Sequence, residues 1–535
     1  MRVRMVSGKR ARWPEAFHSA TAERKSFHAP GTRLDFARHR ECGLLGSQPM
    51  SAGTPAISSS SLTWRVTALS VLAILAAAAV LLVPRHEPWF DEVQAWLLAR
   101  DASRWDILWK YARYEGSPSL WHLVLAWPAR AGAPPVALNA VSSGLALCGA
   151  ALLLFKSPFP RLLRVLLPAG FFFFYQYGIV ARSYALLIPL LWLVAVLYPQ
   201  RFARPWRYVI ALMILSQVSL HGSWIAGALM VIFVGEAWWC ERWPQARLGT
   251  LVLAFAANTA FIIAQLWPRP DLYSPPWVAD RDRIWQVLRD MWLDSVLPWP
   301  WAAFVVLLVA CLFFYTRGVL LSYLLTTAGL LALFAFRFFS VWHQGMLYAL
   351  LVLHAWLAWA SPRRRRIVTA PDECWPALAT GVLTATAAVH VWWSVMAGWN
   401  DWKYPYSGSR EAAQYLRAQG LDRQRIHIFK FSTCAILLYL DRNPFANVAP
   451  FMPGAFWVWT KEIFAGQTAP AVVEGDPPWV LIGAQMLPKD EPKSAPLLPG
   501  YAIERVFPGH MFWKDGYYQS DSYYLYRRIA PPAGG

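Results

Sequence analysis

The sequence has little charge for its length, and this scarcity excludes an ordinary soluble protein. Only 15% of its 535 residues are Asp, Glu, Lys or Arg, whereas soluble domains carry about 25%. Hydrophobic residues make up 57%, and apolar runs of fifteen to twenty-two residues recur between Leu62 and Ala397. Runs of this length match a hydrocarbon core about 30 Å thick. We therefore expect a polytopic membrane protein.

Cysteine is also scarce, and its positions support no covalent scaffold. There are six cysteines, of which three lie in or at apolar runs and only Cys434 lies in the C-terminal part. No C-x-x-C spacing occurs. Neither a disulfide framework nor a cysteine zinc site is expected.

Basic residues outnumber acidic ones by 50 to 31, but this excess does not indicate a nucleic-acid partner. Residues 398–535 are nearly balanced, with 14 basic and 12 acidic side chains, and the excess follows the pattern of cytoplasmic segments. Residues 1–61 hold ten basic and four acidic residues and no periodic apolar face. We expect a disordered cytoplasmic tail there, with Met50 as an alternative start of the chain.

Twelve apolar runs are candidates for membrane spans, and eleven of them are expected to cross. The runs are Leu62–Val83, Pro118–Ala131, Val136–Phe155, Leu162–Tyr177, Ser183–Tyr198, Trp206–Leu220, Ser223–Trp239, Gly249–Trp267, Trp299–Tyr315, Val319–Phe336, Val341–Ala360 and Pro376–Ala397. The exception is Pro118–Ala131, which is short and contains Pro118 and Pro128. We expect this run to lie at the outer interface.

The charges of the connections indicate on which side each one lies. Basic connections without acids, such as Arg363–Arg366, belong inside. The loops Arg85–Glu115, with five basic and six acidic residues, and Pro268–Pro298, with four and five, belong outside. With eleven crossings the N-terminus is cytoplasmic and residues 398–535 are outside, which is the periplasm if the membrane is a bacterial inner membrane.

This topology places several ionisable residues near the outer ends of spans: Arg182, His221, Arg337 and His343. The outer loop that contains Asp91 and Glu92 lies at the same face. Ionisable groups at membrane depth are costly and usually functional. An arginine that reaches the headgroups, or a histidine satisfied within a helix bundle, is the alternative for any single one.

Five short segments together resemble the GT-C superfamily of integral membrane glycosyltransferases, of the protein mannosyltransferase or aminoarabinose transferase type. They are His86–Asp101 with its adjacent acids Asp91 and Glu92, Tyr114–Trp121, Val180–Tyr184 with an Arg-x-Tyr element, Ser219–Gly222 and Trp342–Gly345. The similarity covers roughly residues 62–400. It departs from the family at Ser117 and Ser119, where His and Pro are common, and at Trp342, where we expect an arginine.

The resemblance implies a reaction and a set of roles. A sugar would pass from a polyprenyl-phosphate-linked donor to a lipid, glycan or protein acceptor, with Asp91 as the base and Glu92 as its neighbour. The donor phosphate would contact Arg182, together with His221, Arg337 or His343. Glu115 and Tyr184 are expected on the acceptor side. No cofactor is certain, although Asp91, Glu92 and Glu115 leave a divalent cation as an open alternative.

Other interpretations of the same residues remain. Asp91 and Glu92 also fit a solvated acidic loop or the N-cap of a helix starting near Val93, and Glu115 also fits an ion pair with Arg113. A transporter or flippase of lipid-linked saccharides would explain the spans, although no internal repeat is seen. A glycan ligase that uses a diphosphate-linked donor is the third class.

The chain divides into residues 62–397, the all-α membrane domain, and residues 398–535, a small α/β extramembrane domain. In the second domain the pattern predicts a helix over Ser409–Gln419 and a strand over Arg425–Phe431. Further strands are predicted at Trp479–Gly483, Tyr501–Phe507 and Tyr523–Arg528. This domain has no nucleophile triad or phosphate loop, so we expect an accessory role in acceptor binding.

Overall fold

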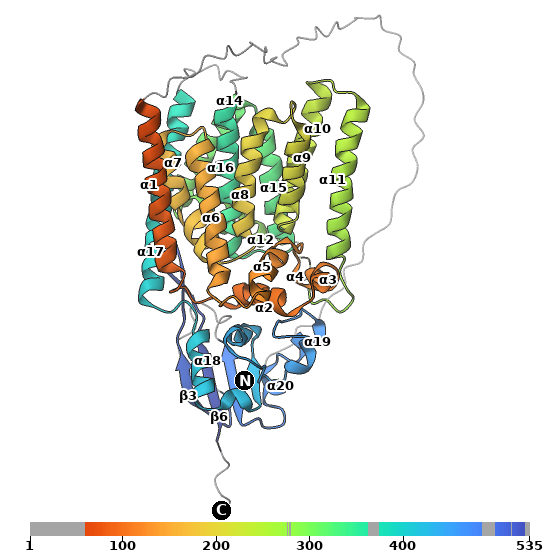
Figure 1. Cartoon of the computed structure of the whole chain (residues 1–535), viewed down its shortest axis with the longest axis vertical. Coiled ribbons are helices and arrows are strands. Elements are labelled where there is room, and N and C mark those ends of the chain that lie inside the picture. Colours follow the sequence, from red (N-terminus) through yellow and green to blue (C-terminus); the bar gives the residue numbers. More distant parts are fainter. Residues whose placement is uncertain are drawn as a thin grey trace, which may run out of the picture. The chain divides into compact units, whose positions relative to one another are not determined.

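The computed structural model describes residues 59–274, 277, 280–361, 374–483, 498–514 and 516–529. The basic segment 1–58 and the run Arg363–Arg366 lie outside the described residues. From residue 59 onward, long helices run side by side in a bundle, and a smaller domain of strands and short helices follows in the C-terminal part (Figure 1).

Seven helices among the described residues are long and apolar enough to cross a membrane, as expected for a polytopic membrane protein. They are α1 (Ser59–Leu82), α6 (Ala137–Lys156), α7 (Arg161–Ala169) continued by the π-helix η2 (Phe171–Ile179), α10 (Leu220–Trp239), α11 (Gln245–Leu266), α14 (Pro300–Arg317) and α17 (Cys374–Lys403). Each coincides with one of the apolar runs of the sequence.

The expected number of eleven full-length spans is not reached, because four of the apolar runs form helices shorter than eighteen residues. These helices are α8 (Tyr184–Leu197), α9 (Pro205–Ser216), α15 (Leu320–Phe336) and α16 (Gln344–Ala360). A helix rises 1.5 Å per residue, so 12 to 17 residues cover roughly 18–26 Å, less than the hydrocarbon core. Helix α16 is buried along nearly its whole length within the bundle.

The loop Arg85–Glu115, named the first outer loop after the side expected for it, and the run Pro118–Ala131 fold into short helices at one end of the bundle (Figure 1). They are α2 (Phe90–Asp101), α3 (Arg104–Asp106), the π-helix η1 (Ile107–Tyr111), α4 (Ala112–Glu115) and α5 (Leu120–Arg130). Helix α5 is the run expected at the interface. It has 11 residues, too few to span a bilayer, and packs against α2.

The C-terminal domain is α/β, as the sequence predicts. A four-stranded sheet has the order β1-β2-β6-β3, in which β1 and β2 are parallel and the other pairs antiparallel. Its strands are β1 (Ile426–Phe429), β2 (Trp479–Gly483), β3 (Tyr501–Phe507) and β6 (Tyr523–Arg528), and β4 (His510–Trp513) and β5 (Gly516–Ser520) form a separate hairpin. The helices of the domain are α18 (Ser409–Ala418), α19 (Lys461–Ala465) and α20 (Ala469–Val473), with a 3₁₀ segment η7 (Phe431–Tyr439).

Both outer loops contact the C-terminal domain. Gln94 of α2 exchanges two hydrogen bonds with the backbone of Trp457. In the second outer loop, which contains α12 (Arg281–Gln286), η4 (Val287–Leu293) and α13 (Asp294–Val296), Asp294 lies 2.7 Å from Lys514 Nζ. The three segments therefore lie at the same end of the bundle.

Candidate functional site

The candidate site is centred on an ion pair between Asp91 and Arg182. Arg182 Nη2 lies 2.9 Å from Asp91 Oδ2, and the two side chains are 18% and 29% exposed. Asp91 stands in the first turn of α2, where the helix dipole favours a carboxylate. Arg182 lies in the short segment between η2 and α8. Two residues far apart in the sequence thus form a pair that solvent can reach.

Aromatic rings hold the Arg182 guanidinium in place. Its centre lies 5.6 Å from the Trp89 ring and 5.3 Å from the Tyr184 ring, within cation–π range. The second terminal nitrogen, Nη1, is buried and has no hydrogen-bond acceptor among the described residues. A guanidinium with one terminal nitrogen paired and the other without an acceptor can still donate hydrogen bonds to an anionic ligand.

Glu92, the second acid of the motif, is fully buried and occupied by hydrogen bonds. Its Oε1 accepts from Asn139 Nδ2 at 2.7 Å and from Ala181 N at 2.6 Å, and Oε2 accepts from Trp89 N at 3.2 Å. Since Ala181 precedes Arg182, Glu92 holds the backbone that presents the guanidinium. The geometry favours a positioning role for Glu92.

His86 extends this buried network toward α17. Its Nε2 lies 3.0 Å from Glu92 Oε2 and its Nδ1 lies 2.7 Å from Asp401 Oδ2, which is 315 residues away in sequence. Burial lowers the pKa of His86, but the Glu92 and Asp401 carboxylates outweigh burial and raise it to about 10. A protonated His86 therefore ties the end of α1 to α2 and α17. Sequence reasoning missed it, because nothing local pairs His86 with Asp401.

The two histidines expected at the donor phosphate lie together beside Tyr184. The ring centres of His221 and His343 are 4.8 Å apart and lie 6.4 Å and 6.2 Å from that of Tyr184. Tyr184 also faces Arg182, so the four residues form one continuous cluster. Arg337 does not extend it: its guanidinium donates to Ser274 and lies 5.3 Å from the Trp277 ring, in the second outer loop.

Glu115 lies next to the C-terminal domain and shares a hydrogen-bond partner with it. Gln94 Nε2 donates to Glu115 Oε1 at 2.8 Å and to the Trp457 carbonyl at 2.7 Å. Burial raises the pKa of Glu115 to about 7, the Gln94 hydrogen bond opposes this rise, and the charge of Asp91 adds to it. Glu115 and Asp91 are therefore within electrostatic reach of each other, and the alternative pairing with Arg113 is not formed.

The C-terminal domain brings a tryptophan and a further carboxyl group to the site, and nothing in the sequence indicated the carboxyl group. Burial raises the pKa of Asp521 to about 7, hydrogen bonds from Ser407 and Tyr523 oppose this, and the charges of Asp91 and Glu92 add to it. Trp513 of β4 lies 4.9 Å from Trp342, and Trp342 lies 5.1 Å from Trp89.

These acids do not form a metal site. Within the described part of the chain, no group of three His, Cys, Asp or Glu side chains is arranged to hold a metal ion. Asp91 is paired with Arg182 and Glu92 is bonded to backbone and amide donors. The divalent-cation alternative therefore finds no ligand set at Asp91, Glu92 and Glu115.

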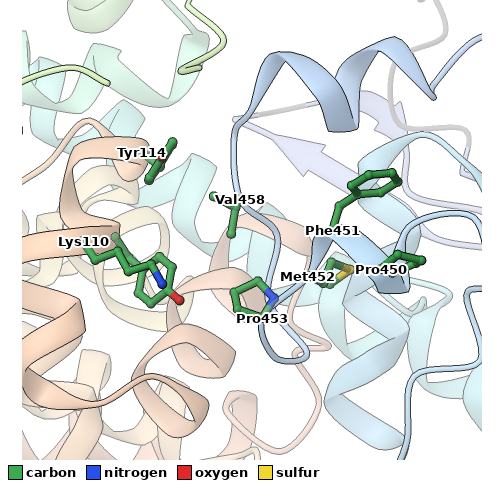
Figure 2. Close-up of a pocket in the computed structure, with 8 residues that line it drawn as sticks. Lys110, Tyr114, Pro450, Phe451, Met452, Pro453 and Val458 are labelled. Atoms are coloured by element: carbon green, nitrogen blue, oxygen red, sulfur yellow. The ribbon is translucent and has the colours of Figure 1, made fainter. Parts of the chain in front are cut away.

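An open cleft of about 280 Å³ lies between the first outer loop and the C-terminal domain. Figure 2 shows Lys110 and Tyr114 on one wall, with Pro450, Phe451, Met452, Pro453 and Val458 on the other. Tyr114 and Val458 are the chain neighbours of Glu115 and Trp457, which Gln94 joins. The cleft therefore adjoins the Glu115 side of the site.

The sequence matches no protein-family model and no curated protein. The resemblance to GT-C enzymes expected from the sequence rests on short motifs alone. The structure brings two of these motifs into contact, because Asp91 belongs to one and Arg182 and Tyr184 to another.

Proposed function

We propose that this chain is a membrane glycosyltransferase that moves a sugar from a polyprenyl-phosphate-linked donor to a hydroxyl group of a lipid, glycan or protein acceptor. The observation that carries the proposal is the pair of Asp91 and Arg182, 2.9 Å apart and partly open to solvent. The reaction needs a base for the acceptor and a cation for the leaving phosphate. This pair supplies both.

The groups can be assigned to the two halves of the displacement. The acceptor oxygen attacks the anomeric carbon and gives its proton to the Asp91 carboxylate. The bond between that carbon and the phosphate oxygen breaks, and polyprenyl phosphate leaves with the electron pair beside Arg182. Burial raises the pKa of Asp91, Arg182 lowers it, and Glu92 raises it again, with a net rise. A carboxylate with a raised pKa is a stronger base.

Donor binding and base activation are coupled in this arrangement. A phosphate that accepts from Nη1 and Nη2 of Arg182 draws the guanidinium away from Asp91 and frees the carboxylate for the acceptor. The Trp89 and Tyr184 rings and the Glu92 bond to Ala181 keep the guanidinium near its place during the exchange. His221 and His343 line the same side of Tyr184.

The proposal includes a topology in a bacterial inner membrane. Eleven crossings follow if the four shorter helices, α8, α9, α15 and α16, cross together with the residues that flank them, in addition to the seven long helices. Residues 1–61 are then cytoplasmic, and the site and the C-terminal domain face the periplasm. The common location of both outer loops and this domain supports the arrangement.

The decisive experiment measures free polyprenyl phosphate released by the purified chain in detergent, with a polyprenyl-phosphate sugar and a mixed lipid and glycan extract as acceptors. We expect release in step with sugar transfer. Asp91→Asn should lower the rate by about 10²–10⁴ and leave donor binding intact, while the surface variant Asp441→Asn, at a side chain 95% exposed, should behave as wild type. Intact lipid-linked sugar moved across a liposome membrane without release would instead show a transporter, and use of a diphosphate-linked donor alone would show a ligase.

A further inference from the structure

The cleft between the first outer loop and the C-terminal domain is chemically distinct from the Asp91–Arg182 pair. Its lining combines aromatic rings, prolines and one exposed cation, Lys110. Phe451 is 42% exposed at its edge. Flat apolar faces with a few polar groups are typical of ligand sites between domains.

The walls of the cleft are held in place by three segments of the chain. The Tyr111 ring packs edge-on against Phe456, with centres 4.9 Å apart. Tyr114 donates its hydroxyl to both oxygens of Asp271, at 3.1 Å and 3.0 Å. The Asp271 carbonyl accepts from Lys461 N at 2.8 Å. The first outer loop, the second outer loop and the C-terminal domain thus build one surface.

A buried glutamine links the surroundings of the cleft to the helix that holds the proposed base. Gln94, which joins Glu115 to Trp457, lies one helical turn after Asp91 on α2. Residues three apart on a helix lie on the same face. Gln94 therefore connects the residues beside the cleft to the face of α2 that holds Asp91.

The charge around the cleft favours an anion. The Lys110 amine lies 5.2 Å from the Tyr111 ring, and the charges of Arg113 and Arg269 act on the Tyr114 hydroxyl. Two carboxylates oppose these cations: Asp271, to which Tyr114 donates, and Asp101, which accepts from Ala455 N at 2.8 Å and is paired with Arg100. A saccharide offers C–H faces that pack on aromatic rings, and a carboxylate or phosphate on it would meet Lys110.

We propose that this cleft binds an anionic saccharide, the acceptor of the transfer reaction or the part of it next to the reacting hydroxyl. The identification of this saccharide as the acceptor rests on the proposed transferase function, whereas its binding is measured without turnover. The ligand class is therefore a carbohydrate that carries carboxylate or phosphate groups.

The experiment measures equilibrium binding of two tetrasaccharides of equal length to the full chain in detergent: hyaluronan tetrasaccharide, which is anionic, and chitotetraose, which is neutral. Wild type should prefer the anionic one by about tenfold, the value of one charge-assisted hydrogen bond. Lys110→Gln should remove this preference, and Phe451→Ala should weaken both tetrasaccharides several-fold. The matched controls Arg423→Gln and Ile503→Ala, at exposed positions elsewhere in the C-terminal domain, should bind as wild type.

Three outcomes would overturn the inference: equal binding of both probes by wild type, unchanged binding by Lys110→Gln and Phe451→Ala, or complete displacement of the anionic probe by inorganic phosphate at constant ionic strength. The last would show a simple anion site. Asp91→Asn should bind both probes as wild type does, so loss of transfer and loss of saccharide binding are separate results. The failure of this inference would leave the release of polyprenyl phosphate as an independent test of the enzyme.

Discussion

Replacement of Arg182 tests the donor-phosphate site most directly. Arg182→Ala removes both terminal nitrogens. In the wild type Nη2 pairs with Asp91, and Nη1 has no acceptor among the described residues. Each charge-assisted hydrogen bond to phosphate contributes about 1.5–3 kcal/mol. The wild-type side chain must leave Asp91 to bind donor, which costs about 1 kcal/mol for a partly exposed pair. The net loss is about 2–5 kcal/mol, so the dissociation constant of the donor should rise roughly thirtyfold or more.

Arg182→Lys separates charge from shape. Lysine keeps the charge but not the fork of donors, so donor binding should weaken by about tenfold, less than in the alanine variant. The assay is titration of a polyprenyl-phosphate sugar into purified protein. Arg100→Lys and Arg100→Ala are matched controls. Arg100 lies on α2, as Asp91 does, and its Nε forms an ion pair with Asp101 Oδ1 at 2.6 Å. Both control variants should bind donor normally.

Replacement of Arg182 should also change the pH dependence of the transfer rate. The positive charge of Arg182 lowers the pKa of Asp91 against the effect of burial. Without it that pKa rises, a smaller fraction of Asp91 is ionised at a given pH, and the acidic limb of the rate profile of Arg182→Ala should move to higher pH. Normal donor binding by both variants, together with an unmoved acidic limb, would refute the assigned role of Arg182.

Three further predictions concern stability and topology. Glu92→Gln should destabilise the fold by about 1.5–3 kcal/mol, because it removes one of the two carboxylates that bind the buried, protonated His86, whereas Asp91→Asn should not; equal thermal midpoints for the two variants would contradict the positioning role. The pKa of Glu115 rises from 4.5 in the unfolded chain to about 7 in the fold, so the fold binds more protons between these values and its stability falls as pH rises through them. Glu115→Gln should lack this fall in thermal unfolding measured from pH 5 to pH 8, and a fall equal to that of wild type would exclude Glu115 as its source. A cysteine at the exposed position 423 should react with an impermeant maleimide on intact cells, and protection there would exclude a periplasmic C-terminal domain.

Local pattern was enough to predict much of the C-terminal domain. The strands Trp479–Gly483, Tyr501–Phe507 and Tyr523–Arg528 are found with the expected bounds. The hairpin of β4 and β5 is absent from the strands that the sequence predicts. Its place is decided by contacts with the bundle, such as that of Trp513 with Trp342.

The sequence by itself determined the class of protein, since the length and composition of an apolar run depend only on neighbouring residues and set whether it suits a bilayer. It also singled out Asp91 and Arg182 through short motifs. The length of an apolar run did not set the length of its helix: α9 ends after 12 residues although its apolar run is longer. The tertiary structure alone brought Arg182 to Asp91, joined His86 to Asp401 and placed Gln94 against Trp457. Such pairings depend on where distant segments meet in space, and no local periodicity encodes that distance.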